Sequence, residues 1–333
     1  MTVLGIVVIG RNEGRRLVRC LDSIGIAQEI VYVDSGSSDG SVAAARARQA
    51  QVVELDVSLP FTAARARNAG RAALSSECEL VQFIDGDCIL QPGWIAVGSM
   101  ALANEPSLAA VFGRRREMRP DASRYNWMCD VEWSVPPGRV RYFGGDVMLR
   151  ASALDQAGGY PSEMIAGEEP DVSIRLRALG WRIACLPAEM TLHDAAITRF
   201  GQWWRRSIRS GHAYAELGAR HAGAAGADYR RRLRGVLAWG GALPVGFLAM
   251  ISAGWVISGS FFFGAAALVG LLLFQFCRLT VRALGQHSPL NALTIGAFLV
   301  LTKPAQAIGV TRYWRNRLME TRGPIIEYKT ESA

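Results

Sequence analysis

The sequence predicts an α/β protein with a doubly wound, mostly parallel, Rossmann-like sheet in its first two-thirds. Short apolar runs typical of buried strands alternate there with stretches whose apolar residues recur at helical spacing. Such alternation indicates βαβ units, in which a helix connects two parallel strands. The expected strands lie at 5–9, 30–34, 52–55 and 80–84, and the expected helices at about 17–24, 41–50 and 62–74.

Charge is unevenly distributed along the 333 residues. Residues 1–195 hold 24 acidic and 20 basic residues, whereas residues 196–333 hold 17 basic and 5 acidic ones. A basic, apolar C-terminal part favours a membrane with anionic headgroups over nucleic acid as a partner. The six cysteines include no C-x-x-C pair, which argues against a zinc site or disulfide framework and favours a reducing compartment.

An uncharged run at 236–277 is long enough for two membrane spans of about 20 residues each, with a turn near 258–260. Arginines flank both ends of this run, so the positive-inside rule predicts a helical hairpin with both ends cytoplasmic. A third apolar segment at about 290–310 is interrupted by Lys303 and Pro304 and is re-entrant, interfacial or spanning. We therefore expect an N-terminal domain at 1–228 and a membrane region at 229–333 that ends in a basic tail.

The apolar run at 3–9 is too short for a signal peptide, and no basic residue precedes it. We therefore expect the N-terminal domain to stay in the cytoplasm, attached to the inner membrane.

Two acidic residues, Asp85 and Asp87, follow the strand at 80–84 and are separated by Gly86. In an α/β sheet, ligands bind at this carboxyl edge. Carboxylate oxygens suit Mg²⁺ or Mn²⁺, usually shared with a phosphate. Asp87 is the preferred metal ligand, while Asp85 supports a ribose or reaches the metal through water. An acidic turn that merely ends a strand is the alternative.

Six segments together resemble the family-2 glycosyltransferases with the GT-A fold. They are Val-Val-Ile-Gly-Arg-Asn-Glu at 7–13, Val-Asp-Ser-Gly-Ser-Ser-Asp-Gly at 33–40, Ala-Arg-Asn-Ala-Gly at 66–70, Phe-Ile-Asp-Gly-Asp at 83–87, Gly-Glu-Glu-Pro-Asp-Val-Ser-Ile-Arg-Leu at 167–176, and His193. Each lies at a predicted strand end or helix start, and the resemblance runs from Val3 to about Gly211. It implies a nucleotide-sugar donor bound with a divalent cation.

The resemblance assigns donor-binding roles to residues of the first strands and helices. Asp34 reads the nucleobase, and the alternative is that Asp34 or Ser35 caps the following turn. Asn12 and Glu13 form the other side of the base pocket, and Asp85 supports the ribose. Arg67 faces the diphosphate, or is a solvated arginine on its helix.

The catalytic base is expected in the Glu168-Glu169 pair. The family usually has Glu-Asp here, with the second acid as general base, so the resemblance assigns Glu169 and leaves Glu168 as the alternative. The base would take the proton of the acceptor hydroxyl as its oxygen attacks the anomeric carbon. Acids in a first helical turn also suit the helix dipole, which is a purely structural explanation.

The family places a metal- or diphosphate-binding histidine at His193, although a lone histidine is often structural. In the next helix, Arg205 and Arg209 close over the diphosphate or face lipid headgroups. The sequence around Gln202 resembles the Gln-x-x-Arg-Trp motif of processive synthases, but Arg206 stands where the tryptophan should be.

Acceptor specificity is expected in residues 111–148. Asp146 follows two glycines and suits an acceptor hydroxyl, and Trp133 suits stacking on a sugar ring or resting on a lipid. A structural turn and ordinary packing explain these two residues as well.

Together these features predict a membrane-anchored, metal-dependent, inverting glycosyltransferase of the hexosyltransferase type (EC 2.4). It would move one sugar from a nucleotide-diphosphate donor, with a UDP-sugar expected, to a lipid-linked acceptor or a growing glycan in cell-envelope polysaccharide biosynthesis. The alternatives are a processive polysaccharide synthase and a catalytically silent, nucleotide-binding membrane scaffold. Two or three spans are too few to build a polymer channel, which favours single-sugar transfer.

Overall fold

The computed structural model describes residues 3–25 and 29–321. These form two compact units, divided between Phe200 and Gly201. The division precedes the boundary expected at residue 228 because helix α8 (Phe200–Arg220) packs on helix α12 (Pro289–Leu318) of the second unit.

The first unit is built on one sheet whose strand order is β3-β2-β1-β4-β8-β6-β9-β5, with β7 on β9. The strands are β1 (Leu4–Gly10), β2 (Glu29–Asp34), β3 (Gln51–Glu54), β4 (Leu80–Asp85), β5 (Cys88–Leu90), β6 (Leu108–Glu117), β7 (Gly138–Val140), β8 (Val147–Arg150) and β9 (Arg182–His193). The first four strands are mutually parallel, as their continuous apolar runs predict. Beyond β4 the sheet is mixed, because β8 runs antiparallel to both β4 and β6.

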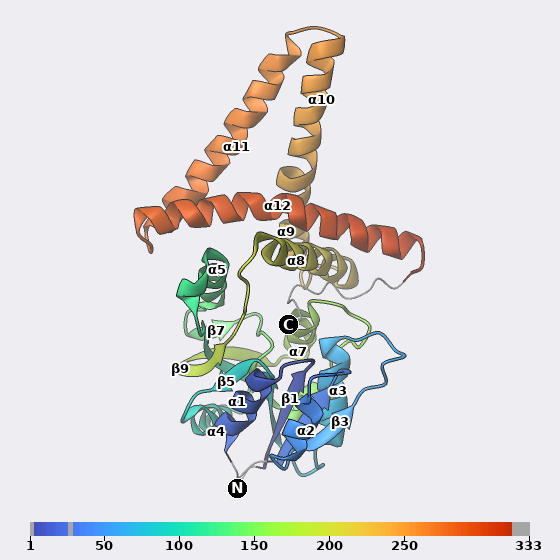
Figure 1. The fold of residues 1–333 in the computed structure, drawn as a ribbon, viewed down its shortest axis with the longest axis vertical. Helices are drawn as coiled ribbons and strands as arrows, with labels where there is room; N and C mark the ends of the chain where they lie inside the picture. The colour runs from blue at the N-terminus through green and yellow to red at the C-terminus, as the bar shows by residue number, and fades with distance from the viewer. Residues whose placement is uncertain (1–2, 26–28, 322–333) are drawn as a thin grey trace. The chain divides into compact units, whose positions relative to one another are not determined.

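Helices surround this sheet in the first unit (Figure 1). They are α1 (Arg15–Ile24), α2 (Ser41–Arg46), α3 (Ala63–Ala73), α4 (Trp94–Asn104), the 3₁₀ turn η1 (Pro120–Ala122), α5 (Arg124–Trp133), α6 (Ala151–Gln156) and α7 (Glu168–Ala178). Helix α3 packs especially close to β1, because a Cβ at Gly70 would collide with Val7. This close packing helps to bring Arg67 of α3 near the carboxyl edge of the sheet.

The register of the parallel strands aligns several acidic positions at that edge. Gly10 at the end of β1 pairs with Asp34 at the end of β2, and Ile9 pairs with Asp85 at the end of β4. Across the sheet, His193 ends β9 opposite Cys88, the first residue of β5. Residues far apart in the sequence are thus brought to one edge.

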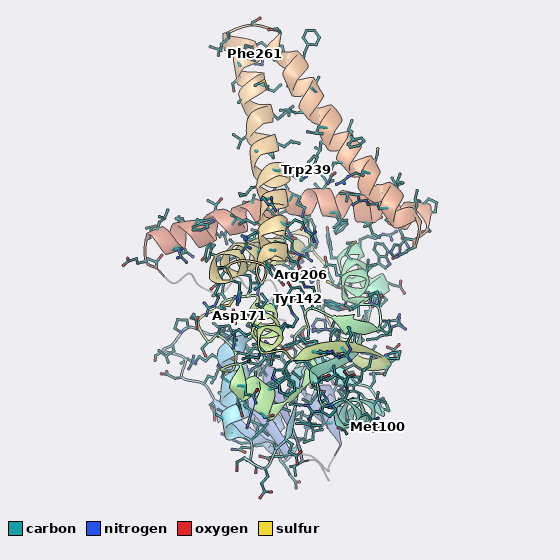
Figure 2. The ribbon with its side chains drawn as sticks, turned by 180° about the vertical axis from the view of Figure 1, so that it is seen from behind. Met100, Tyr142, Asp171, Arg206, Trp239 and Phe261 are labelled. Atoms are coloured by element: carbon teal, nitrogen blue, oxygen red, sulfur yellow. The ribbon has the colours of Figure 1, made fainter. Side chains whose placement is uncertain are left out.

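The second unit is helical. After α8 come α9 (Ala227–Val236), the π-helical segment η2 (Leu237–Ala242), α10 (Leu243–Val256), α11 (Phe261–Leu284) and α12. Three helices, Ala227–Val256, Phe261–Leu284 and Pro289–Leu318, are long and apolar enough to cross a membrane. Within this unit, α10 and α11 form a hairpin with Phe261 at its tip, and α12 runs across the base of the hairpin (Figures 1 and 2).

Pro304 does not interrupt α12, contrary to the expectation from the sequence, since the helix is continuous from Pro289 to Leu318. The lost backbone hydrogen bond falls where another helix supports the chain. Gly240 of η2 packs directly on the backbone of Lys303 and Pro304. A second close crossing joins Gly211 of α8 to the backbone of Gln306.

Candidate active site

The acidic turn after β4 is fixed by its central glycine. The amide of Gly86 donates to the carbonyl oxygen of Ile9 at 2.8 Å. A Cβ at Gly86 would lie 3.2 Å from that oxygen and 3.3 Å from Cγ of Glu13, so a side chain would crowd the turn. The carboxylates of Asp85 and Asp87 are therefore presented from a turn held against β1.

Asp34 organises the loop that follows β2. Its Oδ1 accepts from the hydroxyl of Tyr32 at 2.9 Å, and its Oδ2 accepts from the amides of Gly36 and Ser37 at 2.9 and 2.8 Å. The side chain is almost completely buried. The turn-capping role that the sequence left open is therefore present, and base recognition by Asp34 stays a prediction.

Asn12 connects the end of β1 to the same loop. Its amide donates to Oγ of Ser37 at 2.9 Å, and its Oδ1 accepts from the amide of Ser38 at 2.8 Å. Its φ of +54° is left-handed, a conformation that asparagine tolerates better than most residues. Glu13 pairs with Arg16 at 2.9 Å. The expected pocket residues of β1 and β2 thus come together, through the loop at 35–38.

Arg67 joins three carboxylates from distant parts of the chain. Its guanidinium lies 3.1 Å from Asp85, 3.0 Å from Glu168 and 3.3 Å from Glu169, and its side chain is only 3% exposed. The guanidinium also lies over the ring of Tyr160, 5.5 Å from its centre. Burial excludes the alternative of a solvated arginine, and contact between Arg67 and a diphosphate stays a prediction.

The two candidate bases differ in their surroundings. The side chain of Glu168 is 3% exposed, whereas that of Glu169 is 17% exposed. Burial, followed by repulsion from Glu168, raises the pKa of Glu169 to about 7, and Arg67 opposes this rise. A carboxylate whose pKa lies near neutrality suits proton transfer at physiological pH, so the geometry favours Glu169 over Glu168.

Asp87, Cys88 and His193 form a second cluster. Nε2 of His193 lies 3.2 Å from Oδ2 of Asp87, and one ligand atom from each of the three residues lies within 4.8 Å of the other two. Burial and then the nearby Arg115 lower the pKa of His193 to about 3, so the imidazole is neutral, as a metal ligand must be. Nδ1 of His193 is buried and finds no hydrogen-bond partner in the described part of the chain.

Asp146 was expected to bind an acceptor hydroxyl, which requires an accessible carboxylate. Its side chain is fully buried. The carboxylate accepts from the amide of Asp85 at 3.0 Å, from the thiol of Cys88 at 3.2 Å and from the hydroxyl of Thr191 at 2.8 Å. These contacts correct the expectation: Asp146 supports the acidic turn from behind.

Arg115 of β6 is a site residue that the sequence reasoning missed. Its Nη2 lies 3.4 Å from Asp85 and its Nε 3.6 Å from Asp146. It also lies over the ring of Trp133, 4.8 Å from the centre, and that ring contacts His193 edge-on at 4.6 Å. The available signal was three consecutive arginines late in a strand. Trp133 is thus beside the metal-ligating cluster, and its acceptor role stays a prediction.

The charge balance of this edge fits a divalent cation. Five carboxylates and two guanidiniums gather there: Asp85, Asp87, Asp146, Glu168, Glu169, Arg67 and Arg115. Such an excess of negative charge in a largely buried place is stabilised by a cation. Asp87 and His193 offer an oxygen and a nitrogen of the kind that Mn²⁺ accepts.

Arg205 and Arg209 lie on α8, in the second unit. Arg205 is exposed and Arg209 is half-buried. Their contact with a diphosphate stays a prediction.

The α/β sheet and its carboxylate-rich edge have the arrangement of the GT-A fold, which occurs in glycosyltransferases. Residues 5–150 match the family model described as glycosyl transferase family 2. The match lies within the first unit and agrees with the resemblance seen in the sequence.

Two curated relatives are similar to part of this chain. Pre-mycofactocin glycosyltransferase of Mycobacterium tuberculosis, in two strains, is 27% identical over 234 residues, which cover 65% of this chain and 47% of the relative. The chain thus spans about half the length of these relatives.

Two of the similar solved structures are glycosyl-transferring enzymes by their descriptions, and the first shares the fold. A mannosyltransferase from Pyrobaculum calidifontis, in complex with GDP-Man and Mn²⁺, has a TM-score of 0.62 at 19% identity over 94% of this chain and 87% of its own. Glucosyl-3-phosphoglycerate synthase from Mycobacterium tuberculosis has a TM-score of 0.48 at 21% identity over 66% of this chain and 80% of its own.

Proposed function

We propose that this protein transfers a single sugar from a nucleotide-diphosphate donor to an acceptor hydroxyl, with inversion at the anomeric carbon. One observation carries the proposal: contacts run without a break from the candidate base to the candidate metal ligands. Glu169 and Asp85 share Arg67, Asp85 lies with Cys88 in one cluster, and Cys88 lies with Asp87 and His193 in the other.

Glu169 acts as the general base. It is the more exposed of the two acids and has the pKa of a carboxyl group that can both accept and release a proton near neutrality. Arg67 holds Glu169 and Asp85 at a fixed separation, so the base keeps its orientation relative to the acidic turn. A single attack by the deprotonated acceptor oxygen, opposite the departing diphosphate, inverts the configuration.

The loop after β2 and the end of β1 form the nucleotide site. Asn12 and Asp34 hold the backbone of this loop, and Glu13 lies against Gly86 of the acidic turn. A UDP-sugar is the expected donor, and GDP-sugars belong in the same test because the related mannosyltransferase binds GDP-Man.

Asp87 and His193 would hold a divalent cation, Mn²⁺ or Mg²⁺, with Asp85 beside them. When bound, the cation supplies positive charge to the leaving diphosphate. Asp146 and Arg115 position Asp85 from the buried side and from strand β6, respectively.

The second unit anchors the enzyme in the inner membrane with its first unit in the cytoplasm. The 24 residues of α11 extend about 36 Å, enough for a hydrocarbon core of about 30 Å. Arginines at 230–232, 234, 278 and 282 flank the hairpin, and the positive-inside rule supports a cytoplasmic location for both of its ends. We place α12 in the membrane interface, because it crosses the base of the hairpin (Figure 1) and exposes Leu290 and Leu301.

This location suits an acceptor that is itself membrane-associated, either lipid-linked or part of a growing envelope glycan. The two spans of the hairpin do not enclose a polymer channel, which supports the addition of one sugar over processive synthesis.

The proposal is tested by thermal-shift measurements on the full chain in detergent, with UDP- and GDP-sugars, each with and without Mn²⁺. We expect one donor to raise the Tm only when Mn²⁺ is present, and the same donor to be consumed when an acceptor is added. A catalytically silent scaffold would show the shift without consumption, and the absence of any shift would contradict nucleotide-sugar binding.

A further inference from the structure

The thiol of Cys88 lies where two clusters of metal-ligating side chains meet. One cluster consists of Asp87, Cys88 and His193, and the other of Asp85, Cys88 and Asp146. Cys88 is the residue common to both and is completely buried. Its Sγ lies 3.7 Å from Oδ1 of Asp87 and 3.2 Å from Oδ2 of Asp146. A soft sulfur donor is therefore part of a site otherwise made of oxygen and nitrogen.

The spacing of the first cluster matches a tetrahedral centre. Zinc binds sulfur at about 2.3 Å and binds nitrogen and carboxylate oxygen at about 2.0 Å. In a tetrahedron, a nitrogen and an oxygen ligand therefore lie about 3.3 Å apart, and a sulfur and an oxygen ligand lie about 3.5 Å apart. Here the nitrogen–oxygen distance between His193 and Asp87 is 3.2 Å, and the sulfur–oxygen distance between Cys88 and Asp87 is 3.7 Å. The two distances use different oxygens of one carboxylate, and one ligand atom from each of the three residues lies within 4.8 Å of the other two.

The histidine ring of this cluster is held by few contacts of its own. His193 is almost completely buried, yet its Nδ1 has no hydrogen-bond partner among residues 3–25 and 29–321. Buried imidazole nitrogens are normally paired. The ion would bind Nε2, the nitrogen that lies 3.2 Å from Asp87, and would hold the ring in place where Nδ1 makes no hydrogen bond.

We propose that Asp87, Cys88 and His193 form a thiolate-containing site that binds Zn²⁺ or Co²⁺ and leaves one coordination position open. The inference rests on the proposed function in that the same Asp87 and His193 would hold Mn²⁺ or Mg²⁺. The hexaaqua ion loses five water molecules, gains bonds to oxygen, sulfur and nitrogen, and keeps one water at the open position. The thiol proton passes to Asp146, to which the thiol already donates, and from there to water.

Competition between metal ions follows from the donor set. Thiolate selects Zn²⁺ and Co²⁺, whereas Mn²⁺ and Mg²⁺ prefer oxygen and leave the thiol protonated against Asp146. Zn²⁺ is therefore expected to displace Mn²⁺ from Asp87 and to inhibit sugar transfer, which makes the site sensitive to the zinc level of the cell.

The test is a Co²⁺ titration of the full chain in detergent, followed by absorption spectroscopy. A thiolate ligand gives a charge-transfer band in the near ultraviolet, and tetrahedral Co²⁺ gives intense visible bands. We expect both kinds of band in the wild type. In Cys88→Ser we expect the near-ultraviolet band to be lost and the affinity for Co²⁺ to be weakened roughly tenfold or more. Cys129→Ser, at another buried cysteine, is the matched control and should keep both features.

Weak octahedral bands in the wild type, or a charge-transfer band that survives in Cys88→Ser, would overturn the proposal. If Cys88→Ser does not fold, X-ray absorption of the zinc-loaded wild type decides the matter, since a sulfur at about 2.3 Å supports the site and a shell without sulfur removes it.

Transfer measured on the wild type with Mn²⁺ separates the two proposals. Transfer without the cobalt band refutes only the thiolate site, whereas the band without transfer refutes only the proposed function.

Discussion

Replacement of Glu168 by Gln should move the pH dependence of sugar transfer to lower pH. Glu168 and Glu169 approach the same Nη1 of Arg67 at 3.0 and 3.3 Å. Their oxygens are therefore at most about 6 Å apart, and at an effective dielectric constant of about 20 two like charges at that distance repel by about 2.8 kcal/mol, or about two pKa units. Glu168→Gln removes this repulsion and leaves Arg67 to stabilise the Glu169 carboxylate.

The direction of the expected shift in pH dependence follows from the role of Glu169 as the base. Burial and Glu168 raise the pKa of Glu169 to about 7. A general base works when deprotonated, so wild-type transfer should fall as the pH drops through about 7. Because burial, the largest cause, remains in Glu168→Gln, we expect the midpoint to fall by about one to two pH units rather than to that of a free glutamate.

The assay is the rate of transfer at saturating donor and Mn²⁺, measured from about pH 5 to about pH 9. Glu168→Asp is the matched control, since it keeps the charge and should keep the midpoint near that of the wild type. An unchanged midpoint in Glu168→Gln, or one shifted to higher pH, would refute the assignment of Glu169 as the base beside a charged Glu168.

Other changes test other parts of the structure. Gly145→Ala places a Cβ 2.8 Å from both Arg67 and Asp85, so the rate of transfer should fall about 100-fold. Gly144→Ala is the control, because its Cβ has nothing within 4 Å and its rate should be close to that of the wild type. Equal rates in the two variants would contradict this. Gly211→Val forces a side chain against the backbone of α12 and should destabilise the second unit by about 1–3 kcal/mol, which a lower Tm would reveal. Gly241→Val is the control, because Gly241 faces open space and its replacement should leave the Tm unchanged. Phe261→Cys, at the hairpin tip (Figure 2), should react with an impermeant thiol reagent added from outside the inner membrane, and reaction from the cytoplasmic side alone would contradict the hairpin orientation.

Local sequence was sufficient for much of the fold. Apolar runs predicted β1, β2 and β4 within about one residue, and the turn of the membrane hairpin was expected near 258–260, where α10 ends at Val256 and α11 begins at Phe261. These features depend on periodicity and on glycine and serine at turns, which neighbouring residues determine.

Features that depend on contacts between distant parts of the chain could not be predicted from local sequence. The position of β8 between β4 and β6 leaves no local trace, so the mixed half of the sheet was missed. Arg67 meets Glu168 across 101 residues of sequence, so its buried contacts with carboxylates could not be read from its own helix. Asp146 was assigned to an acceptor because adjacent glycines suggested access, while β6 and β9 in fact bury it.

The continuity of α12 was not predicted for a similar reason, since it depends on a contact with a distant segment. A lysine followed by a proline usually ends a helix, because the ring clashes with the preceding turn. Here η2 brings Gly240 onto the backbone of Lys303, and a helix supported in this way tolerates Pro304. The support comes from a segment about sixty residues earlier and has no signal near the proline.

The central claim is that Glu169 performs the chemistry of a donor held at the neighbouring acidic turn. The most direct test is a comparison of donor affinity and transfer rate between the wild type and Glu169→Gln, both with Mn²⁺. The account predicts donor affinity within about twofold of the wild type and a transfer rate lower by about 100- to 10,000-fold. A Glu169→Gln protein that transfers sugar at the wild-type rate would contradict it.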